Sequence, residues 1–306
     1  MTTGRLATVA GGSTDAASAA DSLRRVRPVD SAAELLEIAS EAAKTAGALL
    51  QERFDAGRES HVSAKSTPTD PVSEADLASQ RAIRAVLAKR RPQDGLLAEE
   101  EGADQVGSSG LRWVVDPLDG TVNFLYGLPQ WSVSVAVCDE QGAVAGAIHA
   151  PMTAEFFSAV RGELPRRNGV ELAWRGDAAP QLAQALVATG FAYASQVRAE
   201  QAELLTRLLP RVRDIRRFGV ASLDLAGTAM GLYDAYYERG VHLWDIAVGA
   251  LMCDGVGLVV REIEGGIMAA PASLADTLCE IIAAGGAAAR ADEGARREPP
   301  TRTPPA

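Results

Sequence analysis

The sequence predicts an α/β fold whose first half is of the α+β type and whose second half is of the α/β type. Between residues 113 and 160, strand-like apolar segments follow one another with only turn signals between them, which favours an antiparallel or mixed sheet. After about residue 181, short apolar segments alternate with helical patterns, as in an α/β layer. We therefore expect an N-terminal half over residues 29–180 and a C-terminal half over residues 181–285, which share one extended interface.

Helix starts and breaks set the expected order of the elements. The pattern Ser31-Ala-Ala-Glu34 is a capping box and opens a helix to about Phe54. Ser73-Glu-Ala-Asp76 opens a second helix, which Arg91-Pro92 closes. Strands are expected at 96–98, 113–115, 131–138, 143–150, 156–160, 185–189, 214–217, 235–238 and 257–263, and further helices at 196–213, 221–232, 245–253 and 273–283.

The charge balance bounds the kind of partner. The chain has 306 residues, 47% of them hydrophobic, and its 30 Lys and Arg against 40 Asp and Glu give a net charge of −10. A surplus of negative charge opposes electrostatic binding of nucleic acid or of an anionic membrane, so we expect neither as a partner. A small phosphorylated substrate remains compatible, because bound cations can reverse the charge of a local site.

No stretch of the sequence reads as a targeting or membrane segment. The N-terminus lacks the apolar run of a secretory signal, and no run approaches the roughly 18–20 apolar residues of a membrane span. The scattered cysteines Cys138, Cys253 and Cys279 are expected to be small buried residues, as in a protein of the reducing cytoplasm. Residues 1–28 and the Pro-rich residues 286–306 are expected to be disordered tails.

The most informative stretch is W-V-V-D-P-L-D-G-T-V-N-F at residues 113–124. A short apolar run ends in Asp116 and Asp119, followed at once by Gly120 and Thr121, so both carboxylates emerge at a strand end, where open sheets place ligands. Two such carboxylates repel unless a cation lies between them, and oxygen ligands favour hard ions such as Mg²⁺. Glycine lets backbone N–H groups approach an anion closely. D-G and D-P pairs are common in turns, but the full string predicts a metal and phosphate site.

Three further motifs each have a plainer alternative. Glu99-Glu100-Glu101-Gly102 follows a strand-like segment, and such acidic runs are usually solvated loops unless a carboxylate faces a metal. Asp245, directly after Trp244, is a good N-cap for the helix that follows, although a helix-start aspartate can also give an oxygen to a metal. In the polar loop that leads to Asp76, Lys65 is our candidate for a phosphate contact, and a solvated lysine is the alternative.

These four motifs, in this order, resemble the inositol monophosphatase family, part of a wider group of Mg²⁺-dependent, lithium-sensitive phosphatases that includes fructose-1,6-bisphosphatase. The resemblance covers roughly residues 31–284, and the D-P-L-D-G-T-V-N-F string together with the distant W-D-I-A pair is very specific. The stretch from Asp234 to Asp245 is also similar to inositol monophosphatases proper. The resemblance implies a layered αβαβα sandwich, a homodimer, two or three Mg²⁺ ions per active site, and hydrolysis of a phosphorylated polyol, foremost myo-inositol monophosphate, by a metal-activated water.

The resemblance also implies roles for individual residues. The implied metal ligands are the carboxylates of Glu99, Asp116, Asp119 and Asp245 and the carbonyl of Leu118. The implied catalytic residues are Glu99, Asp76 and Thr121, of which Asp76 and Thr121 help to orient the attacking water. The implied phosphate or substrate contacts are Asp119, Gly120, Thr121, Gly219, Ala221 and Glu238, the last of these on the inositol hydroxyls.

Three segments depart from the family pattern. Residues 163–167 stand where a Gly-Ala pair is frequent, residues 219–222 read G-V-A-S where bacterial members often have G-S-A-A, and residues 252–257 lack the usual Glu-Ala-Gly. None of these changes removes an implied metal ligand, so they bear on substrate preference and packing. Histidinol phosphate, fructose 1,6-bisphosphate and a nucleotide bisphosphate stay open as substrates. A non-catalytic binding or regulatory protein that keeps the fold is a further alternative.

Overall fold

The computed structural model describes residues 31–57, 62–64, 71–100, 104–174, 176 and 180–283. The two expected tails and Lys65 lie outside these residues. From Ala32 onward the described residues belong to one compact unit. Within the described residues, no helix is both long enough and apolar enough to cross a membrane.

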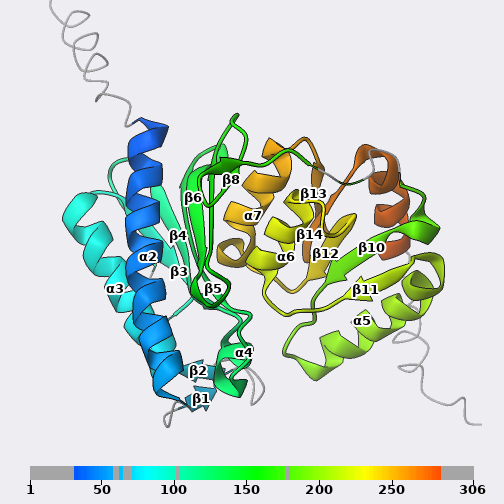
Figure 1. Ribbon diagram of the computed structural model, residues 1–306, viewed down its shortest axis with the longest axis horizontal. Helices are drawn as coiled ribbons and strands as arrows, with labels where there is room; N and C mark the ends of the chain where they lie inside the picture. Colours follow the sequence, from blue (N-terminus) through cyan, green and yellow to red (C-terminus); the bar gives the residue numbers. More distant parts are fainter. Residues whose placement is uncertain are drawn as a thin grey trace, which may run out of the picture. The chain divides into compact units, whose positions relative to one another are not determined.

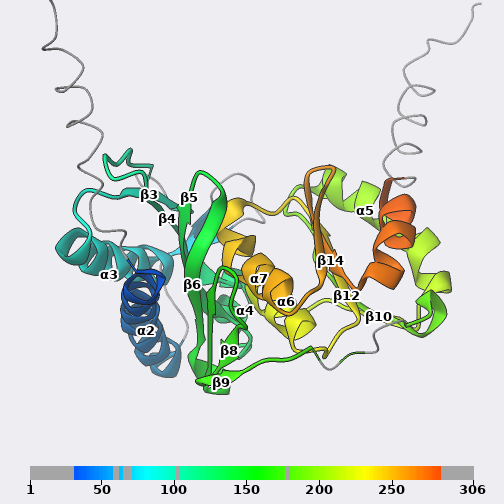
Figure 2. The same cartoon turned by 90° about the horizontal axis from the view of Figure 1, so that it is seen from above.

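Helices and sheets alternate in layers in the order αβαβα, as expected (Figures 1 and 2). Helices α2 (Ala32–Ala56) and α3 (Glu74–Arg90) cover one face of a seven-stranded sheet. Helices α6 (Ala221–Ala229) and α7 (Leu243–Gly255) lie between this sheet and a five-stranded sheet. The outer face of the second sheet is covered by α5 (Ser195–Leu208) and by a helix over residues 272–283.

The seven-stranded sheet is mixed. Its strands follow one another in sequence order, with β3 parallel to β4 and every later neighbour antiparallel. The sequence did not predict the last two strands, since each is only two residues long and they join at a tight Asn168-Gly169 turn. The strands are β3 (Gly95–Ala98), β4 (Arg112–Asp119), β5 (Ser132–Asp139), β6 (Gly142–Ala150), β7 (Glu155–Val160), β8 (Arg166–Arg167) and β9 (Val170–Glu171).

The five-stranded sheet has the order β11-β10-β12-β14-β13. Strand β10 pairs in parallel with β11 and β12, whereas β14 pairs antiparallel with β12 and β13. The sequence did not predict β14, because its G-I-M-A-A segment is poor in the β-branched residues that mark strands. The strands are β10 (Leu186–Thr189), β11 (Asp214–Arg216), β12 (Ala235–Arg239), β13 (Val259–Ile263) and β14 (Gly266–Ala270).

The remaining elements are short. Strands β1 (Val62–Ala64) and β2 (Pro71–Ser73) form a two-stranded antiparallel sheet. Helix α5 ends at Leu208, earlier than expected, and Pro210 lies in the 3₁₀ turn that follows it. The other short helices are α4 (Thr121–Tyr126), η1 (Pro151–Thr153), η2 (Leu182–Gln184) and η3 (Leu209–Arg211).

Three hydrophobic cores lie between the layers. The first joins α2 and α3 to one face of the large sheet and contains the fully buried Trp113 and Trp131. The second lies around α6 and α7 and includes Phe157 and Tyr236. The third packs the outer helices against the small sheet. The last strand of the large sheet ends before residue 180, and the first strand of the small sheet begins after it. The division of the chain into two halves at that point stays a prediction.

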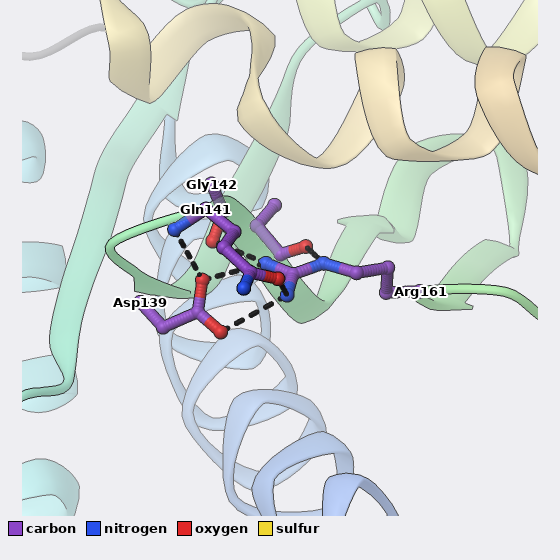
Figure 3. Close-up of polar contacts among 5 residues, drawn as sticks. Asp139, Gln141, Gly142 and Arg161 are labelled. Atoms are coloured by element: carbon purple, nitrogen blue, oxygen red, sulfur yellow. Dashed lines mark hydrogen bonds and ion pairs between the residues drawn. The ribbon is translucent and has the colours of Figure 1, made fainter.

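An arginine links the end of β7 to the turn between β5 and β6 (Figure 3). The Arg161 guanidinium donates to both Asp139 oxygens at 2.8 and 2.9 Å, and to the carbonyls of Gly142 and Ala143 at 2.8 and 2.9 Å. Asp139 also accepts the backbone N–H of Gln141 at 2.8 Å, which closes the turn. Planar, two-point pairing of this kind is among the stronger charge-assisted contacts.

The cysteines behave largely as expected. Cys138 and Cys253 are buried, Cys279 is half-buried, and all three are free thiols. Burial raises the pKa of Cys138 to about 11 and moves the pKa of Cys253 in the same direction. Both buried thiols are therefore neutral and act as small apolar side chains.

Candidate active site

The acidic motifs meet at one edge of the large sheet. Strands β3 and β4 are parallel, so Glu99, directly after β3, lies at the same edge as the end of β4. The pairing of β4 with β5 shifts register between Asp116 and Asp119, which is a bulge around Pro117. Asp116 Oδ1 accepts the backbone N–H of Leu118 at 2.9 Å, which holds the chain in this turn. The D-P-L-D string therefore presents both carboxylates at the strand end.

A cavity of about 130 Å³ brings the candidate residues together. Of the candidate site residues that the structure describes, all except Asp76 line it. Its N-terminal wall comes from β3, β4 and the start of α4, and its C-terminal wall from segments around α6, β12 and α7. The candidate residues that line it are Glu99, Asp116, Leu118, Asp119, Gly120, Thr121, Gly219, Ala221, Glu238 and Asp245.

Asp76 lies behind the cavity and reaches it through Thr121. The helix start expected at Ser73 is confirmed and has a capping box: Asp76 Oδ2 accepts the Ser73 N–H at 2.8 Å, and Ser73 Oγ accepts the Asp76 N–H at 3.4 Å. Asp76 Oδ2 also lies 2.6 Å from the Ser73 hydroxyl oxygen. The Thr121 hydroxyl lies 2.9 Å from Asp76 Oδ1 and 3.1 Å from the Leu118 carbonyl. One oxygen of the Asp76 carboxylate thus caps the start of helix α3, and the other contacts Thr121 in the cavity wall.

The interpretation of Asp245 as a helix N-cap is wrong. Helix α7 begins two residues earlier, at Leu243, and His242 is its N-cap. Asp245 sits in the first turn, where its Oδ2 accepts the His242 N–H at 2.6 Å. The Asp245 side chain therefore accepts the N–H of the N-cap residue, which has no partner within the helix. Asp245 also lines the cavity.

Gly120 allows two distant loops to come together. It has a positive φ of 94°, and a Cβ atom there would lie 2.9 Å from Val220 Cγ2 and 3.1 Å from the Gln130 carbonyl oxygen. The Asn123 amide then joins the same loops, donating to the carbonyls of Gln130 and Phe218 at 2.8 and 2.9 Å. The sequence analysis did not single out Asn123, because its partners are 7 and 95 residues away.

Glu238 is held at the C-terminal wall by a buried tyrosine. The Tyr236 hydroxyl donates to Glu238 Oε2 at 2.8 Å, and Tyr236 itself is fully buried. A Cβ atom at Gly190 would collide with the Glu238 carboxylate, so only glycine leaves room for this position. Burial raises the pKa of Glu238 to about 7, although the hydrogen bond from Tyr236 opposes this shift.

The buried carboxylates repel one another. Burial raises the pKa of Asp119 to about 6, and the charge of Glu99 adds to the shift, while hydrogen bonds from Ser222 oppose it. Burial, followed by the charges of Asp119 and Glu99, raises the pKa of Asp245 well above its ordinary value. A cation in the cavity would remove this repulsion and restore the charged forms.

The donor set fits a hard divalent cation such as Mg²⁺. The cavity offers carboxylate and carbonyl oxygens and no thiol. Within the described parts of the chain, no group of three or more His, Cys, Asp or Glu side chains is arranged to hold one ion. Mg²⁺ is usually bound by one or two carboxylates, with water and substrate phosphate completing its shell. The carboxylates of Asp116 and Asp119 on the N-terminal wall are therefore ligands of the kind that Mg²⁺ prefers.

The cavity also contains residues that sequence reasoning missed. Phe191 to Tyr193 follow β10, and the rule that ligands bind beyond the carboxyl ends of parallel strands would have found them. Arg217 lines the same wall, with its guanidinium 5.7 Å from the centre of the Phe191 ring. His242 lines it as well and stacks on Trp244 with ring centres 4.7 Å apart.

Buried carboxylates and backbone N–H groups at one edge of an αβαβα fold define a hydrolase of phosphate esters. The model of the Inositol monophosphatase family matches residues 31–296, and the chain belongs to this family. Its class of reaction is the hydrolysis of phosphate monoesters.

Relatives with curated names and solved structures agree with this family. An inositol-1-monophosphatase of Mycobacterium leprae (strain TN) is 43% identical over 236 residues, or 72% of this chain and 81% of that protein. The Nus factor SuhB of Escherichia coli (strain K12) is 35% identical over 233 residues, or 76% of this chain and 86% of that protein. The structure of Mycobacterium tuberculosis SuhB matches with a TM-score of 0.70 at 36% identity, covering 83% of this chain and 97% of that one.

Proposed function

We propose that the protein hydrolyses myo-inositol monophosphate to inositol and phosphate in a Mg²⁺-dependent reaction of the inositol-1-monophosphatase type. The observation that carries this proposal is one cavity lined by five acidic side chains and by the Gly120-Thr121 turn. The name of the Mycobacterium leprae relative supports the choice of substrate. Histidinol phosphate, fructose 1,6-bisphosphate and a nucleotide bisphosphate are the alternatives within the same chemistry.

The residues that would hold two or three Mg²⁺ ions come from both walls of the cavity. When bound, Mg²⁺ would neutralise the phosphate oxygens, lower the pKa of a bound water and stabilise the leaving alkoxide. The proposed ligands are the carboxylates of Glu99, Asp116, Asp119 and Asp245 and the carbonyl of Leu118.

The protein groups around this wall have separate tasks in the proposal. Backbone N–H groups of Gly120 and Thr121 bind the phosphate, since the left-handed turn at Gly120 brings the backbone close to the cavity. The Thr121 hydroxyl, 2.9 Å from Asp76, orients the attacking water, with Glu99 beside it on the cavity wall. The Asp76 carboxylate accepts a hydrogen bond from the Thr121 hydroxyl and thereby fixes the Thr121 rotamer.

The C-terminal wall determines which alcohol leaves. Glu238 presents a carboxylate whose position is fixed by Tyr236, and a carboxylate is a good acceptor for the hydroxyls of a polyol. Gly219 and Ala221 add little side-chain volume to this wall. These features favour inositol phosphate over an ester whose alcohol has few hydroxyl groups.

Three further proposals concern the protein as a whole. We propose a homodimer, on the family membership, and a cytoplasmic location, on three unpaired thiols of which two are buried. We also propose inhibition by Li⁺ at millimolar concentration, again on the family membership.

Phosphate release from a panel of substrates tests the proposed function. The panel contains inositol, histidinol and nucleotide phosphates and fructose 1,6-bisphosphate, each with Mg²⁺ and with a chelator. We expect turnover that is highest on inositol phosphate and disappears with the chelator. The absence of turnover on every substrate would favour a binding or regulatory protein, a role that the name of the Escherichia coli relative also suggests.

A further inference from the structure

The carboxylate of Asp119 caps a helix whose second residue, Ser222, lies 103 residues later in the chain. Helix α6 starts at Ala221, and the residue at its N-cap, Val220, has no side-chain acceptor. Asp119 Oδ2 takes this role, accepting the Ser222 N–H at 2.8 Å. A negative charge is favourable at a helix start, where N–H groups lack partners within the helix.

The Ser222 hydroxyl adds a second donor to the same oxygen. Ser222 Oγ lies 2.6 Å from Asp119 Oδ2, and the Ser222 residue is fully buried. Two donors on one oxygen fix the plane of the carboxylate. The carboxylate held in this way lines the cavity.

A second serine, Ser132, forms a hydrogen bond with Ser222. Ser132 Oγ lies 2.8 Å from Ser222 Oγ, and Ser132 is also fully buried. The register of the large sheet places Ser132 directly opposite Asp119. A hydroxyl has a single proton, and that of Ser222 is used on Asp119, so Ser132 is the donor to Ser222. The hydrogen bonds therefore run in one direction, from Ser132 through Ser222 to the carboxylate.

This arrangement depends on a residue at which the chain departs from its family pattern. Residues 219–222 read G-V-A-S where bacterial members often have G-S-A-A, so the hydroxyl at position 222 replaces a methyl group of that pattern. The Ser222 backbone N–H is available whatever the side chain, but the hydroxyl contact requires serine.

We propose that Ser222 is a positioning residue that orients Asp119 for binding Mg²⁺, with Ser132 as its support. The inference rests on the proposed function, because it assigns Asp119 as a metal ligand. Groups that hold a metal ligand in place typically affect metal affinity by about 10- to 100-fold when they are removed.

The same strand provides a matched control. Ser134 lies on β5 two residues after Ser132 and is 1% exposed, and its hydroxyl has no hydrogen-bond partner among the residues that the structure describes. Ser134→Ala therefore makes the same chemical change at the same depth without removing a hydrogen bond. Ser132→Ala removes only the outer donor of the pair.

Calorimetric titration of Mg²⁺ into the metal-free, full-length protein without substrate tests the inference. We expect the dissociation constant to rise about 10-fold in Ser222→Ala, to rise less in Ser132→Ala, and to stay unchanged in Ser134→Ala. Turnover of Ser222→Ala should return close to that of the wild type at saturating Mg²⁺, which a general loss of folding would not allow.

The outcomes separate this inference from the proposed function. A wild-type protein that neither binds Mg²⁺ nor releases phosphate would overturn the proposed function and this inference with it. A wild-type protein that binds Mg²⁺, with equal affinity in Ser222→Ala, would overturn the inference alone. If circular dichroism finds Ser222→Ala unfolded, Ser132→Ala decides: a weaker affinity supports the role, and an unchanged one rejects it.

Discussion

The Asp76 carboxylate and the Thr121 hydroxyl are 2.9 Å apart, although 45 residues separate them in the chain. Asp76 belongs to the first turn of α3, and Thr121 to the turn that follows the central acidic strand. Helix α3 therefore fixes the rotamer of a side chain in the cavity wall. Through Thr121, helix α3 has a direct connection to the proposed attacking water.

We predict that Thr121→Val lowers kcat by about 100-fold or more, while Thr121→Ser retains much of the activity. Valine has the shape of threonine but cannot orient a water, and general acid–base groups usually contribute about 10²–10⁴-fold. Steady-state phosphate release at saturating Mg²⁺ measures the change, with the melting temperature as the control for folding. Equal kcat in Thr121→Val and the wild type would remove Thr121 and Asp76 from the mechanism.

Asp119→Asn should lower kcat by orders of magnitude without unfolding the protein. The substitution removes a charge from the proposed metal site, but the amide oxygen can still accept both Ser222 donors and cap α6. The far-ultraviolet circular dichroism should match that of the wild type. Near-normal turnover in this variant would contradict the role of Asp119 as a metal ligand.

Tyr236→Phe should raise KM for inositol phosphate about five-fold and leave kcat nearly unchanged. The variant loses the hydrogen bond that fixes Glu238, a loss of about 1 kcal/mol. An aryl phosphate without polyol hydroxyls serves as the matched substrate, and its KM should not move. A KM that rises equally for both substrates would mean that Tyr236 affects the cavity as a whole.

Gly190→Ala provides an independent test of the same wall. The added methyl group would meet the Glu238 carboxylate, so the carboxylate must move away. We expect a larger rise of KM for inositol phosphate than in Tyr236→Phe, with little change for the aryl phosphate. A crystal structure of the variant with Glu238 unmoved, together with an unchanged KM, would refute the proposed contact.

The link between Arg161 and Asp139 predicts a pH-dependent contribution to stability. The hydrogen bond from Arg161 lowers the pKa of Asp139 below its ordinary value, so the contribution is present above the unfolded pKa of about 3.9 and is lost as pH falls through the folded value. Asp139→Asn should therefore lower the free energy of unfolding by about 1 kcal/mol at pH 7, and by less near pH 3.

Urea denaturation at both pH values measures this difference. Asp276→Asn is the control, because Asp276 pairs with Arg261 through a side chain that is 80% exposed, and it should change stability little at either pH. A loss in Asp139→Asn that does not depend on pH would mean that the contact does not act through the charge of Asp139.

Local patterns in the sequence predicted much of the fold. The Ser73-Glu-Ala-Asp76 pattern marked the start of α3, and the apolar run from Trp113 ended in the carboxylates at a strand end. Such features depend on neighbours within a few residues, which is why they can be read from one chain. Apolar runs of this kind also predicted the strands of both sheets, except β14 and the two-residue strands β8 and β9.

The details of the site depend on contacts between distant segments. Ser222 and Asn123 act on partners up to 103 residues away, and no local pattern marks such pairs. Asp245 misled the sequence reasoning, because an aspartate in the first turn of a helix and one at its N-cap look alike in a sequence. The structure distinguishes them through the His242 N–H, which donates to Asp245 from outside the helix.

The contact between Asp119 and α6 has a consequence for how the protein is made. On the ribosome, the acidic strand leaves the exit tunnel well before Ser222 has been added to the chain. Until then, the carboxylate that we assign to the metal has neither of the donors that orient it. The Asp119 carboxylate therefore reaches its final orientation only after synthesis has passed the start of α6.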